Sequence, residues 1–240
     1  MTATNTAAFD RSASRYDLMV ALNPGYHREL HRAAGALADR LTDVPDPQVV
    51  DLACGSGAST AALARALPEA ELLGLDASSG MLAAAGAKQW PARVRFEQAV
   101  AGELDLERLG RGSRDGVLTC YLFRNVPEPL RDVAVAEVFA LLRPGGWLVV
   151  QEYSVAGNRG ARRVWDAVSH AVIIPLGALL DRNPGLYRYL WRSVLDFDSV
   201  ARFAYRLVAA VFTDVSHRTA TGWQRGILHT FVARKPEPQP

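Results

Sequence analysis

Short apolar runs recur along the chain, and each is followed by glycine, acidic or other polar residues. Between these runs lie stretches whose apolar residues recur at helical spacing, for example residues 130–142. Apolar runs that alternate with helical stretches in this way predict an α/β fold with a mainly parallel sheet. The predicted strands, in chain order, are 49–52, 71–75, 93–98, 116–121, 147–150, 213–219 and 226–233.

The residues before the first strand carry two more helical patterns, at 7–20 and 26–41. Because they precede the sheet, we interpret residues 1–44 as helices that cap the ligand site. Residues 155–211 are too many for a bare loop in a compact domain. Their apolar and aromatic residues predict helices, which either form a lid over an apolar substrate or simply pack on one another. A further helix is expected at 197–212.

The length of 240 residues suits one α/β domain, with a core at 47–153 and a final strand pair at 213–234. A formal net charge of +2 gives no clustered basic face, so nucleic acid is not an expected partner. His27 and His31 would share a helix face, but no third ligand accompanies them. We therefore expect no metal site.

Two cysteines, Cys54 and Cys120, lie far apart without a paired spacing, which fits a reducing cytoplasm rather than a disulfide framework. The first residues lack the basic and apolar regions of a signal peptide. The longest apolar run, 171–180, is interrupted by proline and glycine and has about half the length of a membrane span. These features predict a cytoplasmic protein with at most peripheral membrane contact.

The most informative stretch, residues 49–60, reads VVDLACGSGAST. A buried strand, a glycine turn and a helix start form the first half of a nucleotide-binding βαβ unit. A dinucleotide fingerprint would place a third glycine where Thr60 stands. The Asp51 carboxylate is a poor neighbour for a pyrophosphate but a good one for ammonium and sulfonium groups, which favours S-adenosylmethionine. A dinucleotide, or an ordinary strand–turn–helix without a ligand, remains an alternative.

Asp76 supports a nucleoside ligand. It follows the second strand, 19 positions after Gly57, where an acidic residue can hold a ribose diol. Ser78 is a candidate N-cap of the next helix, and capping is also the alternative role for Asp76. The third strand is followed by Ala99 and Val100 rather than by an acid that would read the adenine amino group. Backbone groups near Val100 are then expected to contact adenine.

Arg124 and Asn125 follow the strand 116–121, at the strand end where open α/β sheets bind ligands. They are candidates for chemistry, although Arg124 could instead form a surface salt bridge. Residues 151–153, Gln-Glu-Tyr, lie at the exit of the next strand, on the same side. The residues expected to bind S-adenosylmethionine are Tyr16, Asp51, Ala53, Cys54, Gly55, Ser56, Gly57, Asp76, Ala77, Met81, Val100 and Tyr121.

Four segments carry a family resemblance over nearly the whole chain: Phe9-Asp10 through Arg15–Met19, Gly25–Arg28, Arg124–Val126, and Tyr187–Leu190 with Ser193 and Phe197. With the GSG turn and Asp76, they resemble class I S-adenosylmethionine-dependent methyltransferases, and more narrowly the ubiquinone/menaquinone biosynthesis C-methyltransferases. The resemblance implies a Rossmann-like seven-stranded sheet of order 3-2-1-4-5-7-6. It also implies that the last strand is antiparallel.

The resemblance implies C-methylation of a quinone- or hydroquinone-like ring, such as a demethylmenaquinone, in quinone biosynthesis. A phenol has a pKa near 10, so the site must stabilise a phenolate. We assign this role to Arg124, with Asn125 orienting the oxygen and with Tyr153 and Tyr16 as weaker candidates for closing the pocket or relaying the proton. The expected partner is a hydrophobic aromatic small molecule, and a homodimer is left open.

Two rival functions remain. One is O- or C-methylation of a soluble aromatic natural product, which a lid containing Trp191 would also suit. The other is a protein that binds S-adenosylmethionine without transferring its methyl group and catalyses a rearrangement. A nicotinamide oxidoreductase is disfavoured by the charge argument at Asp51.

Overall fold

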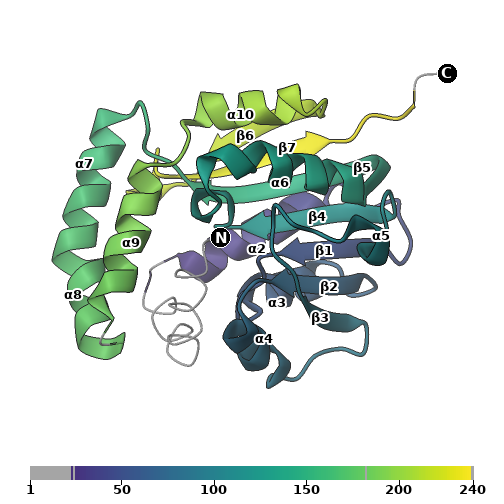
Figure 1. Cartoon of the computed structure of the whole chain (residues 1–240), viewed down its shortest axis with the longest axis horizontal. Helices are drawn as coiled ribbons and strands as arrows, with labels where there is room; N and C mark the ends of the chain where they lie inside the picture. Colours follow the sequence, from purple (N-terminus) through teal and green to yellow (C-terminus); the bar gives the residue numbers. More distant parts are fainter. Residues whose placement is uncertain (1–22, 24, 182, 239–240) are drawn as a thin grey trace.

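The computed structural model describes residues 23, 25–181 and 183–238, which form a seven-stranded sheet flanked by helices (Figure 1). The strand order is β3-β2-β1-β4-β5-β7-β6, as the resemblance implied. The parallel strands are β1 to β5, and β7 runs antiparallel to both of its neighbours. Their bounds are β1 (Gln48–Leu52), β2 (Glu71–Asp76), β3 (Val94–Gln98), β4 (Arg114–Cys120), β5 (Leu142–Tyr153), β6 (Thr213–Thr219) and β7 (Leu228–Arg234).

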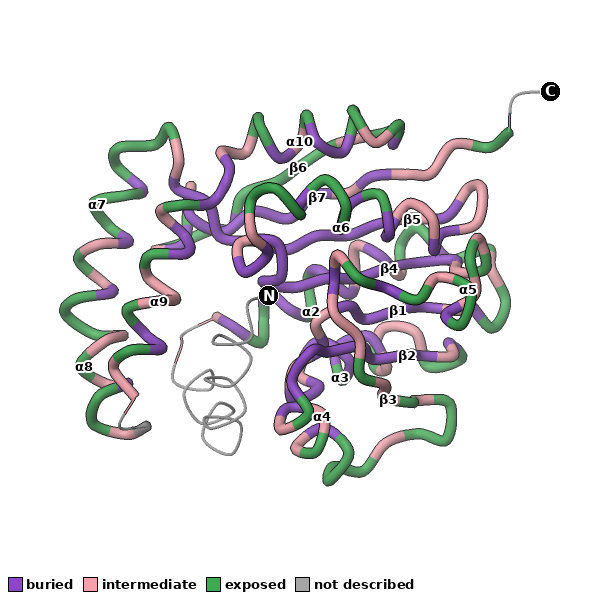
Figure 2. The backbone as a smooth tube through the Cα atoms, in the orientation of Figure 1, coloured by how far each residue is buried: buried purple, intermediate pink, exposed green. Residues whose placement is uncertain are grey.

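Neighbouring strand residues point to opposite faces of the sheet, and both faces are covered. Val50 belongs to the apolar cluster that contains Val138 and Phe203, whereas Val49 belongs to the cluster that contains Leu63. Burial on both faces explains why the central strands are apolar without alternation. Figure 2 shows these strands buried along their length. The helices of the two layers include α3 (Ala58–Ala66), α4 (Ser79–Gly86), α5 (Leu106–Leu109), α6 (Glu128–Leu141) and α10 (Val200–Ala209).

Helix α2 (Tyr26–Ala38) is the part of the expected cap at residues 1–44 that the structure describes as a helix. It packs against α3 and the sheet, where Leu30, Ala34 and Leu37 are buried in the cluster of Val49. The apolar residues of α2 recur at helical spacing, so one face of the helix is buried from water. The helix expected at 7–20 lies outside the described residues.

The segment between β5 and α10 is helical, as predicted. A long helical run consists of α7 (Arg159–Val168), a π-helical turn η2 (Ser169–Ile173), α8 (Ile174–Leu176) and a second π-helical turn η3 (Gly177–Asp181). It folds back through α9 (Pro184–Leu195), and the pair, which we call the helical hairpin, stands at one end of the molecule (Figure 1). A lid function for this hairpin remains a prediction.

Three boundaries differ from the sequence-based expectation. Strand β5 extends well beyond the predicted 147–150 because β4 and β7 pair with it on both sides. The helix predicted at 197–212 is α10, and it is shorter because Ser199 caps its first turn. The last strand, predicted at 226–233, is β7 and begins at Leu228.

Gly74 in β2 offers a test of core packing. A Cβ at this position would lie 2.6 Å from the Phe96 ring and 3.1 Å from the Cys54 sulfur. We expect Gly74→Ala to lower the free energy of unfolding by about 1–3 kcal/mol, because an extra methyl group forces these neighbours apart. Gly35→Ala is the control: it lies in α2 with open space around its Cβ position, and it should stabilise by roughly 0.5–1 kcal/mol. Urea denaturation measures both, and equal effects would contradict the packing argument.

Candidate active site

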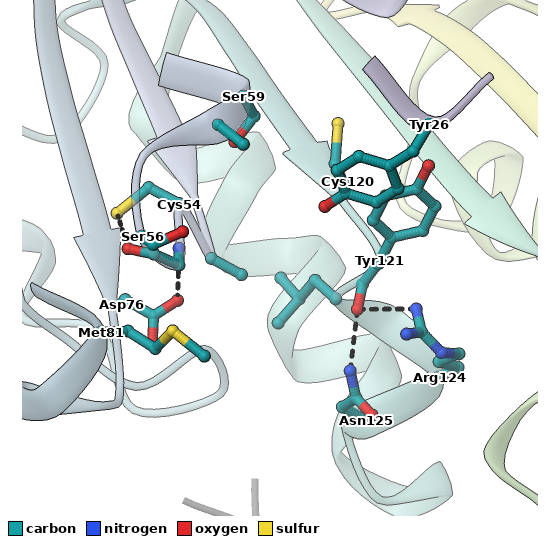
Figure 3. A pocket seen from close by; sticks show the side chains of 14 residues that line it. Tyr26, Cys54, Ser56, Ser59, Asp76, Met81, Cys120, Tyr121, Arg124 and Asn125 are labelled. Atoms are coloured by element: carbon teal, nitrogen blue, oxygen red, sulfur yellow. Dashed lines mark hydrogen bonds between the residues drawn. The ribbon is translucent and has the colours of Figure 1, made fainter. Parts of the chain in front are cut away.

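A cavity opens at the carboxyl ends of β1, β2 and β4, the edge at which parallel sheets bind ligands (Figure 3). One side of it belongs to the glycine turn and to Asp76, and the other to the residues that follow β4. The residues that line it are Tyr26, Ala53, Cys54, Gly55, Ser56, Ala58, Ser59, Asp76, Met81, Cys120, Tyr121, Leu122, Arg124 and Asn125.

The turn between β1 and α3 has a backbone that favours glycine. Gly55 has a φ of 54° and Gly57, which precedes α3, has a φ of 91°. A Cβ at Gly55 would enter open space beside the cavity rather than meet protein atoms. The backbone N–H groups of Ala53 and Cys54 both donate to the carbonyl of Leu75, which ties the turn to the end of β2. The turn is therefore held open for a ligand to approach its backbone.

Asp76 connects the two βα units. Its Oδ2 accepts a hydrogen bond from the Gly55 N–H at 2.9 Å, and its Oδ1 accepts one from the Ser78 N–H at 2.8 Å. Ser78 caps α4 as predicted, since its hydroxyl accepts from the Met81 N–H at 3.1 Å. An ionised carboxylate only accepts hydrogen bonds, so the hydroxyl groups of a ribose are suitable donors to Asp76. Its position at the cavity wall fits that role.

Asp51 lies behind the cavity wall and is fully buried. Its Oδ2 accepts hydrogen bonds from the hydroxyl groups of Ser59 and Thr60, at 2.7 and 2.6 Å. Its Oδ1 has no hydrogen-bond partner within the described part of the chain. Burial raises the pKa of Asp51 to about 6, against the lowering effect of the two hydroxyl groups. A buried carboxylate of this kind suits a cationic ligand, because a nearby positive charge stabilises its ionised form.

The pKa of Asp51 predicts how cofactor binding depends on pH. Below a pH of about 6 the carboxyl group is neutral, and above it the group is charged and attracts a cation. The dissociation constant for S-adenosylmethionine should therefore fall by roughly tenfold as the pH rises through this value. Calorimetric titrations across the range measure it. The Asp51→Asn variant should bind with little pH dependence, and an unchanged slope in that variant would assign the titration to another group.

Arg124 lies on the opposite side of the cavity, in the short helix η1 (Phe123–Asn125). Its Nη1 donates to Glu152 Oε1 at 2.8 Å and to the backbone carbonyl of Tyr121 at 2.9 Å. The Glu152 side chain is fully buried, and that of Arg124 is 7% exposed. The alternative of a surface salt bridge is thus wrong, because the ion pair is inside the protein and beside the cavity.

Asn125 completes this side of the site. Its Nδ2 donates to the same Tyr121 carbonyl at 2.8 Å, so Arg124 and Asn125 converge on one oxygen (Figure 3). Its Oδ1 accepts from the Tyr189 hydroxyl at 3.0 Å, which connects α9 of the helical hairpin to the cavity. The convergence is possible because Tyr121 has a left-handed backbone conformation, with a φ of 65°. Strain of this kind costs free energy and is often retained at functional sites.

A stack of aromatic rings runs from the cavity toward α7. Tyr26 stacks on Tyr121, Tyr121 on Tyr153, and Tyr153 on Trp165, with centroids 5.0 to 5.5 Å apart. Tyr26 and Tyr121 line the cavity, whereas Tyr153 is one ring further back, and its hydroxyl oxygen accepts a hydrogen bond from Gln224 Nε2 at 3.2 Å. Burial raises the pKa of the Tyr121 hydroxyl well above its usual value. The stack gives the cavity a flat apolar wall.

Most of the predicted site residues meet at this cavity. Among those that do not line it, Asp51, Gly57 and Ala77 lie in or beside the turn, Tyr153 lies behind Tyr121, and Val100 follows β3. Tyr16 is outside the described residues. Sequence reasoning missed five of the lining residues, which are Tyr26, Ala58, Ser59, Cys120 and Leu122, and it did not pair Glu152 with Arg124. A signal for Ser59 was its place in the first turn of the helix after the glycines.

Comparison with known proteins agrees with this geometry. The model of the ubiE/COQ5 methyltransferase family matches residues 3–235. The chain belongs to this family. It is 33% identical over 218 residues to the ubiquinone/menaquinone biosynthesis C-methyltransferase UbiE of Methylobacterium nodulans, covering 89% of this chain and 84% of that protein. It is 32% identical over 228 residues to the demethylmenaquinone methyltransferase of Mycolicibacterium vanbaalenii, with 95% and 92% covered.

Solved structures share the fold of this ubiE/COQ5 family member. The 1,6-didemethyltoxoflavin-N1-methyltransferase of Burkholderia thailandensis, solved with its substrate and S-adenosylhomocysteine, aligns with a TM-score of 0.65 at 20% identity. The alignment covers 99% of this chain and 92% of that one. A methyltransferase of Thermotoga maritima aligns with a TM-score of 0.61 at 18% identity, with 96% and 99% covered. At these identities the similarity extends to the fold.

The ubiE/COQ5 chain is therefore an S-adenosylmethionine-dependent methyltransferase. Its own residues fit that cofactor. Gly55 leaves room for a ligand at the turn, and Asp76 is placed for a ribose diol. Asp51 keeps one buried oxygen without a protein partner among the described residues, behind the wall where a cationic group would bind. Asp76 and the turn residues Cys54 and Ser56 lie on one side of the cavity, opposite Arg124 and Asn125 (Figure 3).

Proposed function

We propose that this enzyme methylates a ring carbon of a hydroquinone that resembles a demethylmenaquinone, in the biosynthesis of a quinone. The observation that carries the proposal is the cavity wall opposite the glycine turn. There a buried ion pair and an amide, Arg124 and Asn125, adjoin the stacked rings of Tyr26 and Tyr121. A flat apolar wall beside a buried cation suits a ring that must become a phenolate. The names of the relatives support the same substrate class.

S-adenosylmethionine, when bound, supplies an electrophilic methyl group. Asp76 would hold its ribose, and the turn around Gly55 would contact the remainder through the backbone. The carboxylate of Asp51 would favour its positive charge from behind the wall. Because the two sides of the cavity face each other, binding both molecules orients the methyl group toward the ring. Positioning of this kind is worth up to about 7–11 kcal/mol of the barrier in well-oriented systems.

Arg124 has the central part in our mechanism. A hydroquinone carbon attacks well only after a ring hydroxyl has lost its proton, and the guanidinium lowers the free energy of the resulting phenolate. Asn125, held by the Tyr121 carbonyl and the Tyr189 hydroxyl, would fix the position of that oxygen. Glu152 holds Arg124 in place by its buried ion pair. After the methyl group has joined the carbon, the hydrogen of that carbon leaves as a proton.

The direct test is methyl transfer from labelled S-adenosylmethionine to a reduced naphthoquinone with and without a prenyl tail. We expect a product heavier by one methyl group, with the new methyl on a ring carbon by NMR. A methylated oxygen, or turnover restricted to soluble tail-free aromatics, would replace the proposal by the natural-product alternative. A product without added mass would indicate a rearrangement instead.

A further inference from the structure

In the long helix of the hairpin, every fourth residue from 161 to 177 faces the protein, and together these residues form a ridge. Ala161, Trp165, Ser169 and Gly177 are buried, and Ile173 between them is half-buried. An α-helix repeats every 3.6 residues, so the two π-helical turns, which have a longer repeat, keep this ridge in line. The ridge is directed at α9: the Trp165 indole N–H donates to the Trp191 carbonyl at 3.1 Å. The orientation of the helix is therefore fixed by the fold.

The opposite face of the same helix is apolar and exposed. Leu179 is 74% exposed, Val172 46% and Val164 42%. Ala167, Ala171 and Pro175 on the same helix are exposed as well, and we call these six residues the outer stripe. By length and composition the run Arg159–Leu180 could cross a membrane, and 17% of its most apolar stretch is buried inside the protein. Contiguous apolar patches that are exposed on a protein surface mark interaction sites.

Charge is distributed unevenly between this hairpin and the rest of the chain. Residues 159–195 contain six arginines and two aspartates, a net charge of +4, whereas the whole chain carries +2, which leaves −2 for the remainder. Arg159, Arg162 and Arg163 are exposed at the first turns of α7, next to the outer stripe. Arg188 and Arg192 are exposed on α9. Arginine beside an exposed apolar helix face is the composition of helices that lie in a membrane interface.

We propose that the outer stripe docks on the surface of a bilayer that contains anionic lipids. The stripe would lie at the boundary between headgroups and acyl chains, and the arginines would contact the headgroups. The inference rests on the proposed function, because a hydroquinone with a prenyl tail is dissolved in the bilayer. The hairpin adjoins the cavity: Leu186 and Tyr187 pack against Met81, and Tyr189 bonds to Asn125. Docking there would bring the acceptor side of the cavity to the lipid.

Two other occupants fit the face less well. A second copy of the chain would bring two hairpins of +4 together, and like charges disfavour that contact. A membrane-spanning orientation would place the buried ridge, with the half-buried Asp166, in hydrocarbon. The Trp191 indole N–H donates to Asp166 at 2.8 Å, so α9 would have to accompany it. Surface docking leaves these tertiary contacts intact.

The test is flotation of the full chain with vesicles of phosphatidylcholine, with or without phosphatidylglycerol. We expect binding to the anionic vesicles, weakened by salt. Val172→Gln with Leu179→Gln should reduce the partition coefficient by roughly tenfold per side chain, because each loses the burial of a large aliphatic group. Arg162→Gln with Arg163→Gln should reduce binding to the anionic vesicles alone. The matched control is Val133→Gln with Val208→Gln, which lie 44% and 54% exposed on α6 and α10.

Three results would overturn the proposal. The first is that the protein binds neither kind of vesicle, and the second is that the control variant loses as much binding as Val172→Gln with Leu179→Gln, which we call the stripe variant. The third is a dimer in light scattering that the stripe variant converts to a monomer. A tail-free, water-soluble hydroquinone tests the proposed methylation separately from membrane docking, because this substrate reaches the cavity without a bilayer. The stripe variant should methylate that substrate as fast as the parent protein but methylate a tailed substrate in vesicles with a raised KM. Vesicle binding without any methylation would refute the function and retain the docking surface.

Discussion

Arg124→Ala is expected to lower kcat by about 10²–10³-fold while the affinity for S-adenosylmethionine stays nearly unchanged. This magnitude is typical for removal of a preorganised group that stabilises developing negative charge. Arg124 stands across the cavity from Asp76 and the glycine turn, so its loss should affect the acceptor rather than the cofactor. Steady-state kinetics with calorimetry of cofactor binding measure both quantities. Full turnover in the variant would show that Arg124 does not stabilise the phenolate.

The same substitution also removes the partner of a buried carboxylate. Glu152 is fully buried and paired with Arg124, so the single variant should lose about 3–5 kcal/mol of unfolding free energy. Arg124→Met with Glu152→Gln removes both charges and should recover much of that stability, while kcat stays as low as in Arg124→Ala. Recovery of activity in the double variant would mean that the loss came from an unpaired charge and not from the missing cation.

A matched control is available in a second buried ion pair. Arg131 pairs with Asp198 at 3.2 Å, and their side chains are 6% and 4% exposed. Neither residue lines the cavity. Asp198 also pairs with Arg206 at 2.6 Å, so it keeps a cationic partner when Arg131 is lost. Arg131→Ala should therefore destabilise the protein less than Arg124→Ala does, and kcat per folded molecule should stay close to that of the parent. An equal loss of kcat would attribute the effect of Arg124 to stability.

Asp76→Ala is expected to raise the dissociation constant for S-adenosylmethionine by at least about 100-fold. Two hydrogen bonds from a ribose to a carboxylate contribute roughly 1.5–3 kcal/mol each. The variant also loses the bonds that Asp76 accepts from the Gly55 and Ser78 N–H groups, which hold the turn in place. Calorimetry with S-adenosylmethionine, S-adenosylhomocysteine and NAD measures the effect, and NAD should not bind.

Asp105→Ala provides the comparison for that variant. Asp105 caps α5 by accepting from the Arg108 N–H at 3.1 Å, away from the cavity lining. Like Asp76→Ala, the Asp105→Ala variant removes a carboxylate that accepts from a backbone N–H group. It should leave the affinity for S-adenosylmethionine unchanged. Asp76→Asn keeps the size of the side chain and should retain part of the affinity. Unaltered binding in Asp76→Ala would contradict its assignment to the ribose.

The strand–turn–helix at 49–60 and the acid that follows β2 were predictable from the sequence because their geometry is local. A buried strand, glycines that adopt positive φ and a helix with good propensity lie within one short segment. The parallel register of β1 and β2 then brings Asp76 to the turn whatever the rest of the chain does. The strand order needed the family resemblance as well, since apolar runs do not specify which strands are neighbours.

Tertiary structure alone decided the surroundings of the acceptor side. Glu152 and Arg124 are 28 positions apart, and they meet because β4 and β5 pair in parallel and end at the same edge. The position of α2 on the sheet brings Tyr26 onto Tyr121. Asp51 has a raised pKa because packing removes it from water.

Local residue order thus determined the fold class, the cofactor turn and the candidate residues of this protein. Burial, ring stacking and the pairing of charges depend on contacts between distant segments, and these contacts form when the sheet assembles. The outer stripe shows the same division. Its apolar residues were visible in the sequence as a short run, but only the packing of the ridge against α9 leaves them facing outward. A periodic pattern identifies a helix, whereas its neighbours determine which face remains for a partner.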